Sequence, residues 1–177
     1  MWGWLAVDRW LVLMLLGTLP RSNGLRSTPQ THRLRHGRYS EHGRSYLVTM
    51  VTHHRQRLFT NLYVGRLLVA EFRQVHELGL VDSLAWVIMP DHIHWLFELK
   101  QQTLGDVVRR IKSRSTLTIN RRRQSQERVW QPGYYDRAVR VEDDIRTMAR
   151  YIVANPLRAG LVEHLGDYPL WDATWLL

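Results

Sequence analysis

The spacing of hydrophobic residues changes in a regular order along the chain. The segment SYLVTMVT, residues 45–52, is rich in β-branched side chains, which is typical of a strand. Residues 61–79 carry apolar side chains at helical spacing and end at Gly79, a residue that often follows a helix. The pattern predicts a strand followed by an amphipathic helix.

A β-hairpin is predicted next. SLAWVIM, residues 83–89, is apolar on both faces, as expected of a central strand. Pro90 and Asp91 then form a turn into HIHWLFEL, residues 92–99. Because side chains alternate across a strand, the core face of this second strand is predicted to consist of Ile93, Trp95, Phe97 and Leu99.

Two further helices and a short strand complete the pattern. A helix with Leu104, Val107, Val108 and Ile111 on one face runs into a basic segment, residues 121–128. A short strand is predicted within residues 129–139, and a helix from about Glu142 to Ala154 stops before Pro156. The order is that of an α+β, ferredoxin-like split βαβ fold, an antiparallel sheet with helices packed on one face. Many functions share this fold, so function must be argued from a site.

The composition indicates one domain. The 177 residues are 45% hydrophobic, enough for one compact core and too few for two. We assign residues 33–177 to this domain and residues 1–32 to an extension outside it. The apolar run from Leu11 to Leu16 is too short to span a bilayer and lacks the flanks of a signal peptide, so no membrane partner is expected. The chain has no cysteine, which excludes disulfides and thiolate chemistry and favours the cytoplasm.

The charge of the chain indicates a polyanionic partner. Lys and Arg number 25 against 16 acidic residues, a formal charge of +9. A solvated surface would explain any single arginine, and a solvated tail would explain residues 31–45, but the net charge favours DNA for the set. The candidate DNA-binding residues are Arg33, Arg35, Arg38, Arg44, Arg109, Arg110, Lys112, Arg114, Arg121, Arg122 and Arg123.

Two histidines interrupt the hydrophobic hairpin. His92 and His94 share the strand face opposite the core residues, so their imidazoles can hold one divalent cation. Taken alone, a His-x-His pair is more often a pair of ordinary hydrogen-bonded histidines. Glu98 lies on the same face but at the far end of the strand, and is expected to be a surface carboxylate.

The last predicted helix carries a second group of polar candidates. Tyr151 and Asn155 fall one turn apart on the flank of its apolar stripe. Taken alone, Tyr151 would be an amphipathic residue whose ring is buried and whose hydroxyl is solvated, and Asn155 would be a helix C-cap. Tyr134 and Tyr135, on the short strand, could reach the same cleft.

Together these segments resemble a known family. His92-Ile93-His94 is similar to the HUH motif, and ARYIVANPLRAGLV, residues 149–162, is similar to the tyrosine-helix signature of the REP-associated tyrosine transposases, a branch of the single-tyrosine HUH transposases. The segments at residues 37–59, 86–99, 129–137 and 167–171 stand in the family's order. The resemblance covers roughly Gly37 to Trp171 and implies the HUH endonuclease fold.

The resemblance also implies an activity and its residues. Tyr151 would cleave single-stranded DNA through a covalent 5′-phosphotyrosine and permit strand transfer, with Tyr135 as the second choice of nucleophile. His92, His94 and Asn155 would hold Mg²⁺ or Mn²⁺, although Asn155 is one methylene shorter than the glutamine of related enzymes. The target would be a hairpin-forming, REP-like repeat, and the enzyme a monomer or homodimer in the cytoplasm, associated with the nucleoid.

Two other functions remain to be separated from this one. A non-catalytic hairpin-DNA-binding regulator would have no need of the two histidines, Tyr151 and Asn155 together. A metal-dependent hydrolase that uses water would need acidic ligands, and the sequence shows no acidic cluster for them. A covalent adduct between protein and DNA would distinguish the transposase from both.

The extension outside the domain gives the first prediction. Deletion of Met1 to Gln30 is expected to leave folding and DNA cleavage intact, because none of the segments that carry the resemblance lies there. Thermal unfolding and cleavage assays of the truncated and full chains test this. A large loss of solubility or activity would show that the segment belongs to the domain.

Overall fold

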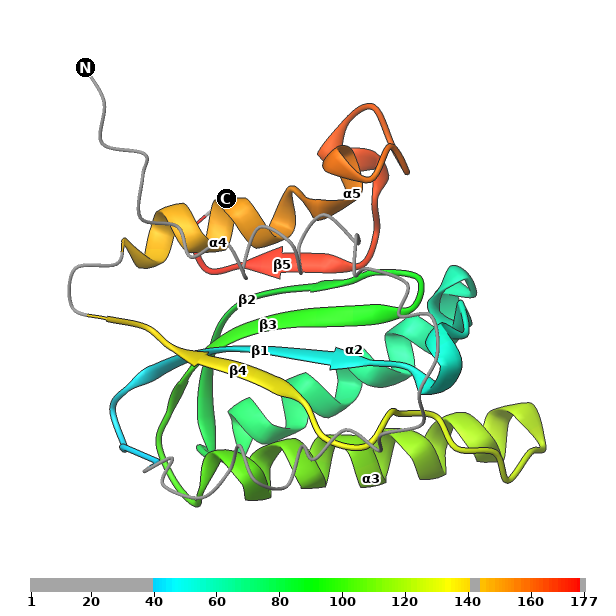
Figure 1. Ribbon diagram of the computed structural model, residues 1–177, viewed down its shortest axis with the longest axis horizontal. Helices are drawn as coiled ribbons and strands as arrows, with labels where there is room; N and C mark the ends of the chain where they lie inside the picture. Colours follow the sequence, from blue (N-terminus) through cyan, green and yellow to red (C-terminus); the bar gives the residue numbers. More distant parts are fainter. Residues whose placement is uncertain (1–39, 141–143, 176–177) are drawn as a thin grey trace, which may run out of the picture.

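A five-stranded antiparallel sheet forms the centre of the protein (Figure 1). The computed structural model describes residues 40–140 and 144–175. The strands lie in the order β4-β1-β3-β2-β5, so β3 is central. Their bounds are β1 (Ser45–Val51), β2 (Val81–Ile88), β3 (His92–Leu99), β4 (Tyr135–Ala138) and β5 (Trp171–Ala173). The predicted extension and Arg33, Arg35 and Arg38 lie outside the described residues.

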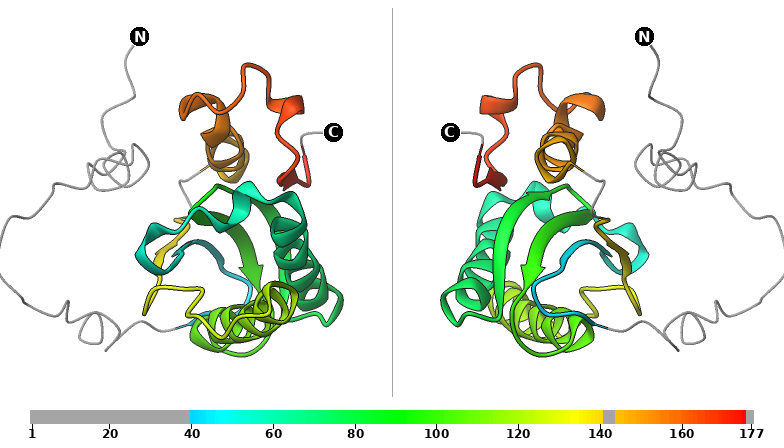
Figure 2. Two further views of the ribbon diagram at one scale, coloured as in Figure 1. Left: turned by 90° about the vertical axis from the view of Figure 1, so that its right-hand side faces the viewer. Right: turned by 90° about the vertical axis from the view of Figure 1, so that its left-hand side faces the viewer.

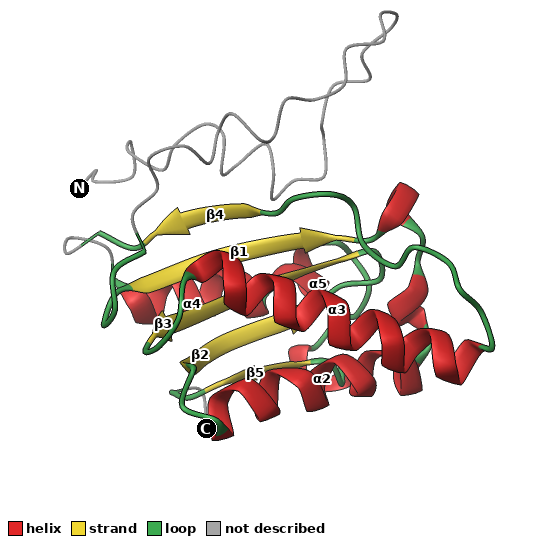
Figure 3. Ribbon diagram, turned by 90° about the horizontal axis from the view of Figure 1, so that it is seen from below, coloured by secondary structure: helices red, strands yellow, loops and turns green. Residues whose placement is uncertain are grey.

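Two long helices cover one face of the sheet, as Figure 3 shows. They are α2 (Leu62–Glu77) and α3 (Leu104–Arg123). The core beneath them contains the predicted face of β3, where the rings of Phe72 and Trp95 stack with centroids 4.6 Å apart. The buried indole of Trp95 donates to Ser83 Oγ at 3.0 Å, so its one polar group is satisfied. The ferredoxin-like prediction is confirmed.

A third layer lies on the opposite face. Helix α4 (Ile145–Val153) packs there, followed by the short α5 (Asn155–Arg158), as the two views of Figure 2 show. The stripe predicted for this helix contributes Ala149 and Ile152, both buried, to a core with Leu47 and Leu96. The prediction of helices on one face therefore holds for α2 and α3, while α4 covers the other face. The split βαβ pattern alone does not specify this layer.

Side-chain caps explain where the three longer helices begin. Asn61 accepts hydrogen bonds from the backbone at the start of α2, Thr103 does so for α3, and Asp144 for α4. At the end of α2, Gly79 adopts φ +65° directly after the C-cap Leu78, a conformation that glycine adopts without strain. Within the described residues, single-turn 3₁₀ helices lie at His53–Arg55, Leu58–Thr60 and Leu165–Asp167. Among the described residues no helix is long and apolar enough to cross a membrane.

The core under α2 generates a stability prediction. Replacing Phe72, 1% exposed, with alanine removes its ring from the Trp95 stack and leaves a cavity, which is expected to cost about 3–5 kcal/mol in the free energy of unfolding. Urea denaturation followed by circular dichroism measures this. Leu117→Ala on α3 is the control, because this leucine is 67% exposed and its loss should change stability by about 0.5 kcal/mol or less. Equal effects of the two substitutions would contradict this description of the core.

Candidate active site

The alternation of β3 directs both predicted histidines toward the α4 layer. Leu96, on the same strand face, is buried in the core beneath α4, and the rings of His92 and His94 have centroids 5.0 Å apart. His94 is 2% exposed, whereas His92 is only partly buried. The central strand β3 thus presents one buried and one partly buried imidazole on the same face.

The imidazole of His94 is held in a state suited to ligation. Thr49 Oγ1 lies 2.9 Å from its Nδ1, and its Nε2 is buried with no hydrogen-bond partner among the described residues. Burial lowers the pKa of His94 well below its usual value, and the charges of His92 and Arg158 lower it further. The ring is therefore neutral near pH 7, and with its hydrogen on Nδ1 it presents a lone pair at Nε2.

Asp91 holds the second histidine. Its Oδ1 lies 2.6 Å from His92 Nδ1, and its Oδ2 accepts from Arg55 Nη1 at 3.0 Å. Burial opposes ionisation of this carboxyl, but the hydrogen bonds from His92 and Arg55 outweigh it and lower the pKa of Asp91. A carboxylate on Nδ1 fixes the orientation of the ring and leaves Nε2 for a ligand, as in many metal sites.

Tyr151 and Asn155 lie where α4 meets α5. Tyr151 is partly buried beside the core under α4, and Asn155, 4% exposed, is the first residue of α5. Asn155 Nδ2 donates to the Ile152 carbonyl at 2.7 Å, and its Oδ1 accepts from Arg158 Nη2 at 2.9 Å. The amide oxygen keeps a second lone pair, so Asn155 can serve as an oxygen ligand while it holds the end of α4.

Arg158 is a site residue that the sequence analysis missed. Its Cζ lies 3.9 Å from the centroid of the Tyr151 ring, and its Nη2 donates to the Tyr151 carbonyl at 2.7 Å. It is present in the signature that resembles the transposase family, seven residues after Tyr151. In a continuous helix the seventh residue lies two turns further on the same face, so this spacing is a signal that the sequence analysis did not use; the structure places Arg158 at the end of α5 with its guanidinium over the Tyr151 ring.

The two competing tyrosines point to different faces of the sheet. Tyr135 pairs with Thr49, which pairs with His94, so Tyr135 shares the histidine face and is 46% exposed there. Tyr134 instead lines a cavity of about 940 Å³ on the other side, with Tyr46 and Leu104. Tyr135 therefore remains the alternative nucleophile, and Tyr134 does not face the histidines.

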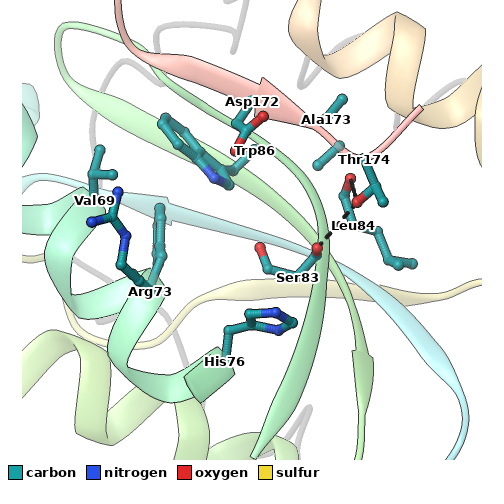
Figure 4. A pocket seen from close by; sticks show the side chains of 11 residues that line it. Val69, Arg73, His76, Ser83, Leu84, Trp86, Asp172, Ala173 and Thr174 are labelled. Carbon is teal, nitrogen blue, oxygen red and sulfur yellow. Dashed lines mark hydrogen bonds between the residues drawn. The ribbon is translucent and has the colours of Figure 1, made fainter. Parts of the chain in front are cut away.

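A second cavity, of about 400 Å³, lies at the opposite edge of the sheet. Figure 4 shows its lining from α2, β2 and β5, including Arg73, His76 and Asp172, with Thr174 Oγ1 donating to the Ser83 carbonyl. None of the residues predicted for the active site lines it. We therefore do not assign this cavity to the site.

The predicted DNA-binding residues that the structure describes are mostly on α3, across the sheet from the histidines. Several have protein partners: Arg44 pairs with Glu41, Arg109 with Asp106 and Arg114 with Glu71. Lys112 Nζ donates to the carbonyls of Gln131 and Gly133, which ties α3 to the segment before β4. Arg110 is partly buried, and the exposed basic group is Arg121, Arg122 and Arg123 at the end of α3.

The fold and site define the class of protein. Within residues 40–140 and 144–175 no three His, Asp or Glu side chains gather, and the candidate site consists of two histidines on β3 with Tyr151 on α4 and Asn155 on α5. Residues 40–155 match the model of the family described as transposase IS200 like, and the chain belongs to this family.

Two similar proteins and one similar solved structure indicate a group within this family. A protein of Escherichia coli named as a REP-associated tyrosine transposase is 30% identical over 87 residues, 48% of this chain and 50% of its own length. A Haemophilus influenzae protein classed with the same group is 26% identical over 138 residues, 72% of this chain and 78% of its own. A solved REP-associated tyrosine transposase bound to a REP hairpin superposes with a TM-score of 0.65 at 26% identity, covering 77% of this chain and 81% of that one. The resemblance to this group is confirmed.

The burial of His94 predicts a pH dependence of stability. Its pKa is lowered in the folded protein, so the unfolded chain takes up the proton first as the pH falls. The stabilising contribution is therefore fully present above pH ~6.5, the ordinary histidine pKa, and is lost as the pH falls toward the folded value. We expect the melting temperature to fall between about pH 7.5 and about pH 5, and less steeply in His94→Gln.

Differential scanning fluorimetry across this range, without added metal, measures the effect. His164→Gln is the matched control, because His164 is exposed and its loss should leave the slope of the wild type unchanged. The same slope in wild type and His94→Gln would contradict the assignment.

Proposed function

We propose that the protein cleaves and rejoins single-stranded DNA at hairpin-forming, REP-like repeats, with Tyr151 as the nucleophile. The observation that carries the proposal is the meeting of two distant segments on one face of the sheet. Arg158 stacks on the ring of Tyr151, hydrogen-bonds to Asn155, and lies close enough to His94 for its charge to act on that ring. A tyrosine, two histidines and an amide are thus collected from β3, α4 and α5.

The proposed reaction is a reversible transesterification. Tyr151 Oη forms a bond to the scissile phosphorus, the bond from phosphorus to the 3′ oxygen breaks, and the phenol proton is released as the 3′ oxygen takes one up. The products are a 5′-phosphotyrosine and a free 3′-hydroxyl. Attack by that hydroxyl, or by one from another strand, reverses the step and frees the enzyme, so strand transfer needs no external energy source.

We further propose that His92, His94 and Asn155 hold a divalent cation, Mg²⁺ or Mn²⁺. The buried and unpartnered Nε2 of His94 supports this, because a polar atom in that position is costly unless it acquires a partner. Asp91 and Thr49 orient the two rings so that both Nε2 atoms are available. When bound, such a cation would neutralise charge on the phosphate.

DNA contacts are proposed for the arginines with the greatest freedom to make them. Arg121, Arg122 and Arg123 project from the end of α3, and their planar forks suit backbone phosphates. The solved structure that resembles this chain is of a protein bound to a REP hairpin, which supports a hairpin as the ligand here. Lys112 and Arg114 are the weaker candidates, since both already bind protein groups.

A covalent adduct tests the proposed reaction. The protein is incubated with Mn²⁺ and hairpin DNA from repeats of its own genome, labelled at the 3′ end because the tyrosine would retain the 3′ portion of the strand, and run on a denaturing gel. We expect an adduct in the wild type and in Tyr135→Phe, and none in Tyr151→Phe, because the proposed nucleophile is the hydroxyl of Tyr151.

The other outcomes identify the competing functions. An adduct lost only in Tyr135→Phe would identify Tyr135, on β4, as the nucleophile. Cleavage without an adduct would favour a hydrolase that uses water. Hairpin binding without cleavage, across several repeats and metals, would favour a DNA-binding regulator.

The proposed cation gives a separate prediction. Thr49→Val removes the hydroxyl that orients His94 and preserves the shape of the side chain, and is expected to weaken Mn²⁺ binding by about 10–100-fold. Electron paramagnetic resonance of free Mn²⁺ measures this without DNA. Thr118→Val on α3 is the control, because that hydroxyl lies across the sheet and bonds to Arg114 and Glu71. An unchanged affinity of Thr49→Val for Mn²⁺ would contradict the assignment of His94 as a ligand oriented by Thr49.

A further inference from the structure

Arg158 makes an unusual set of contacts for a surface arginine. A single nitrogen, Nη2, donates both to the Tyr151 carbonyl at 2.7 Å and to Asn155 Oδ1 at 2.9 Å, and the guanidinium lies over the Tyr151 ring at 3.9 Å. The last residue of α5 therefore fixes the ring of the proposed nucleophile and the amide of a proposed ligand at the same time. Such a cation–π contact restricts the ring as well as attracting the charge.

The charge of Arg158 has no carboxylate partner in the part of the chain that the structure describes. The contrast with other arginines is clear, since Arg44, Arg55, Arg109 and Arg114 each lie beside an Asp or Glu. The groups around Arg158 are instead a phenol, an amide and, more distantly, the neutral ring of His94. A positive charge in such surroundings is electrostatically suited to an anion from outside the protein.

The guanidinium also retains donors for that anion. An arginine has five N–H groups, and the hydrogen bonds to the Tyr151 carbonyl and to Asn155 use those of Nη2 alone. The three on Nε and Nη1 make no hydrogen bond within residues 40–140 and 144–175. Two parallel N–H groups in a planar fork match two oxygens of a phosphate, which a lysine ammonium cannot reproduce. Arg158 is exposed over part of its surface, so DNA can reach it.

We propose that Arg158 is a catalytic residue that donates hydrogen bonds to non-bridging oxygens of the phosphate attacked by Tyr151, while its stack on the ring holds the nucleophile in line with that phosphate. This inference rests on the proposed function. Arg158 transfers no proton, because a guanidinium stays protonated; it stabilises the negative charge that the oxygens carry as the bond to Tyr151 forms. The bonds made and broken are those of the transesterification above.

Three variants separate this role from the alternatives. Arg158→Met removes the charge and the donors, Arg158→Lys keeps the charge without the fork, and Arg150→Met is the matched control, which removes one exposed positive charge from the residue next to Tyr151. Adduct formation is measured under single-turnover conditions on the own-genome hairpin with saturating Mn²⁺. We expect a fall of about 100-fold in rate for Arg158→Met, a partial recovery in Arg158→Lys, and wild-type rates for Arg150→Met.

A modified substrate identifies the group that Arg158 contacts. Replacing one non-bridging oxygen of the scissile phosphate by a methyl group, as separate methylphosphonate diastereomers, removes the charge that the arginine would neutralise. On at least one diastereomer we expect the rate difference between the wild type and Arg158→Met to be much smaller than on unmodified DNA, because the negative charge and one of the two accepting oxygens are gone. A purely structural arginine would give the same fold loss on unmodified DNA and on both diastereomers, and that result would overturn the proposal.

Two further readouts distinguish failure of this inference from failure of the proposed function. Melting temperature and Mn²⁺ affinity of Arg158→Met show whether the variant folds and keeps its ligand set. An adduct in the wild type with an equal rate in Arg158→Met would overturn the role of Arg158 alone. No adduct in the wild type on unmodified hairpins would overturn both proposals.

Discussion

The two-residue repeat of β3 is the constraint on which the rest of the structure depends. This strand is central: β1 and β2 pair with its two edges, and the cores under α2 and α3 and under α4 cover its two faces. Its odd-numbered residues build the core under α2 and α3, and its even-numbered residues place two histidines and Leu96 under α4. A slip of one residue in register would bury the histidines among Phe72 and its neighbours and move Trp95 to the face beneath α4, so the packing that stabilises the sheet also orients the imidazoles.

Burial gives the two histidines different environments on one strand. His94 lies deep in the protein and is held by a neutral hydroxyl from β1, while His92 lies nearer the surface and is held by a carboxylate from the hairpin turn. Both contacts involve Nδ1. The hydrogen bonds come from β1 and from the hairpin turn next to the strand, so the orientation of the pair is coupled to the pairing of the sheet itself.

The break between α4 and α5 brings the remaining chemistry to that face. Residue 158 lies seven positions after Tyr151 and ends the short helix that begins at Asn155, and its guanidinium lies over the Tyr151 ring. Pro156 has no N–H to continue the earlier helix and occupies the first turn of the next one, where none is needed. A local feature of the backbone thus joins the nucleophile, the amide and a cation in one cluster.

The sequence by itself determined β1 to β4, the three longer helices, the two faces of β3 and the positions of the tyrosine, histidines and asparagine, because strand and helix periods act over a few residues and are visible in any window of that length. The short α5 and the edge strand β5 were not predicted, because segments of three or four residues are too short to show a period. Tertiary structure alone decided that α4 covers the face opposite α2 and α3, that Thr49 and Asp91 hold the rings, and that Lys112 ties α3 to the segment before β4. These contacts join residues that are mostly far apart in the chain, and their geometry follows from how the layers pack rather than from any local pattern. Arg158 differs from these, because its contacts with Tyr151 and Asn155 span no more than seven residues; the sequence carries the spacing, and the structure supplies the geometry of the stacked guanidinium.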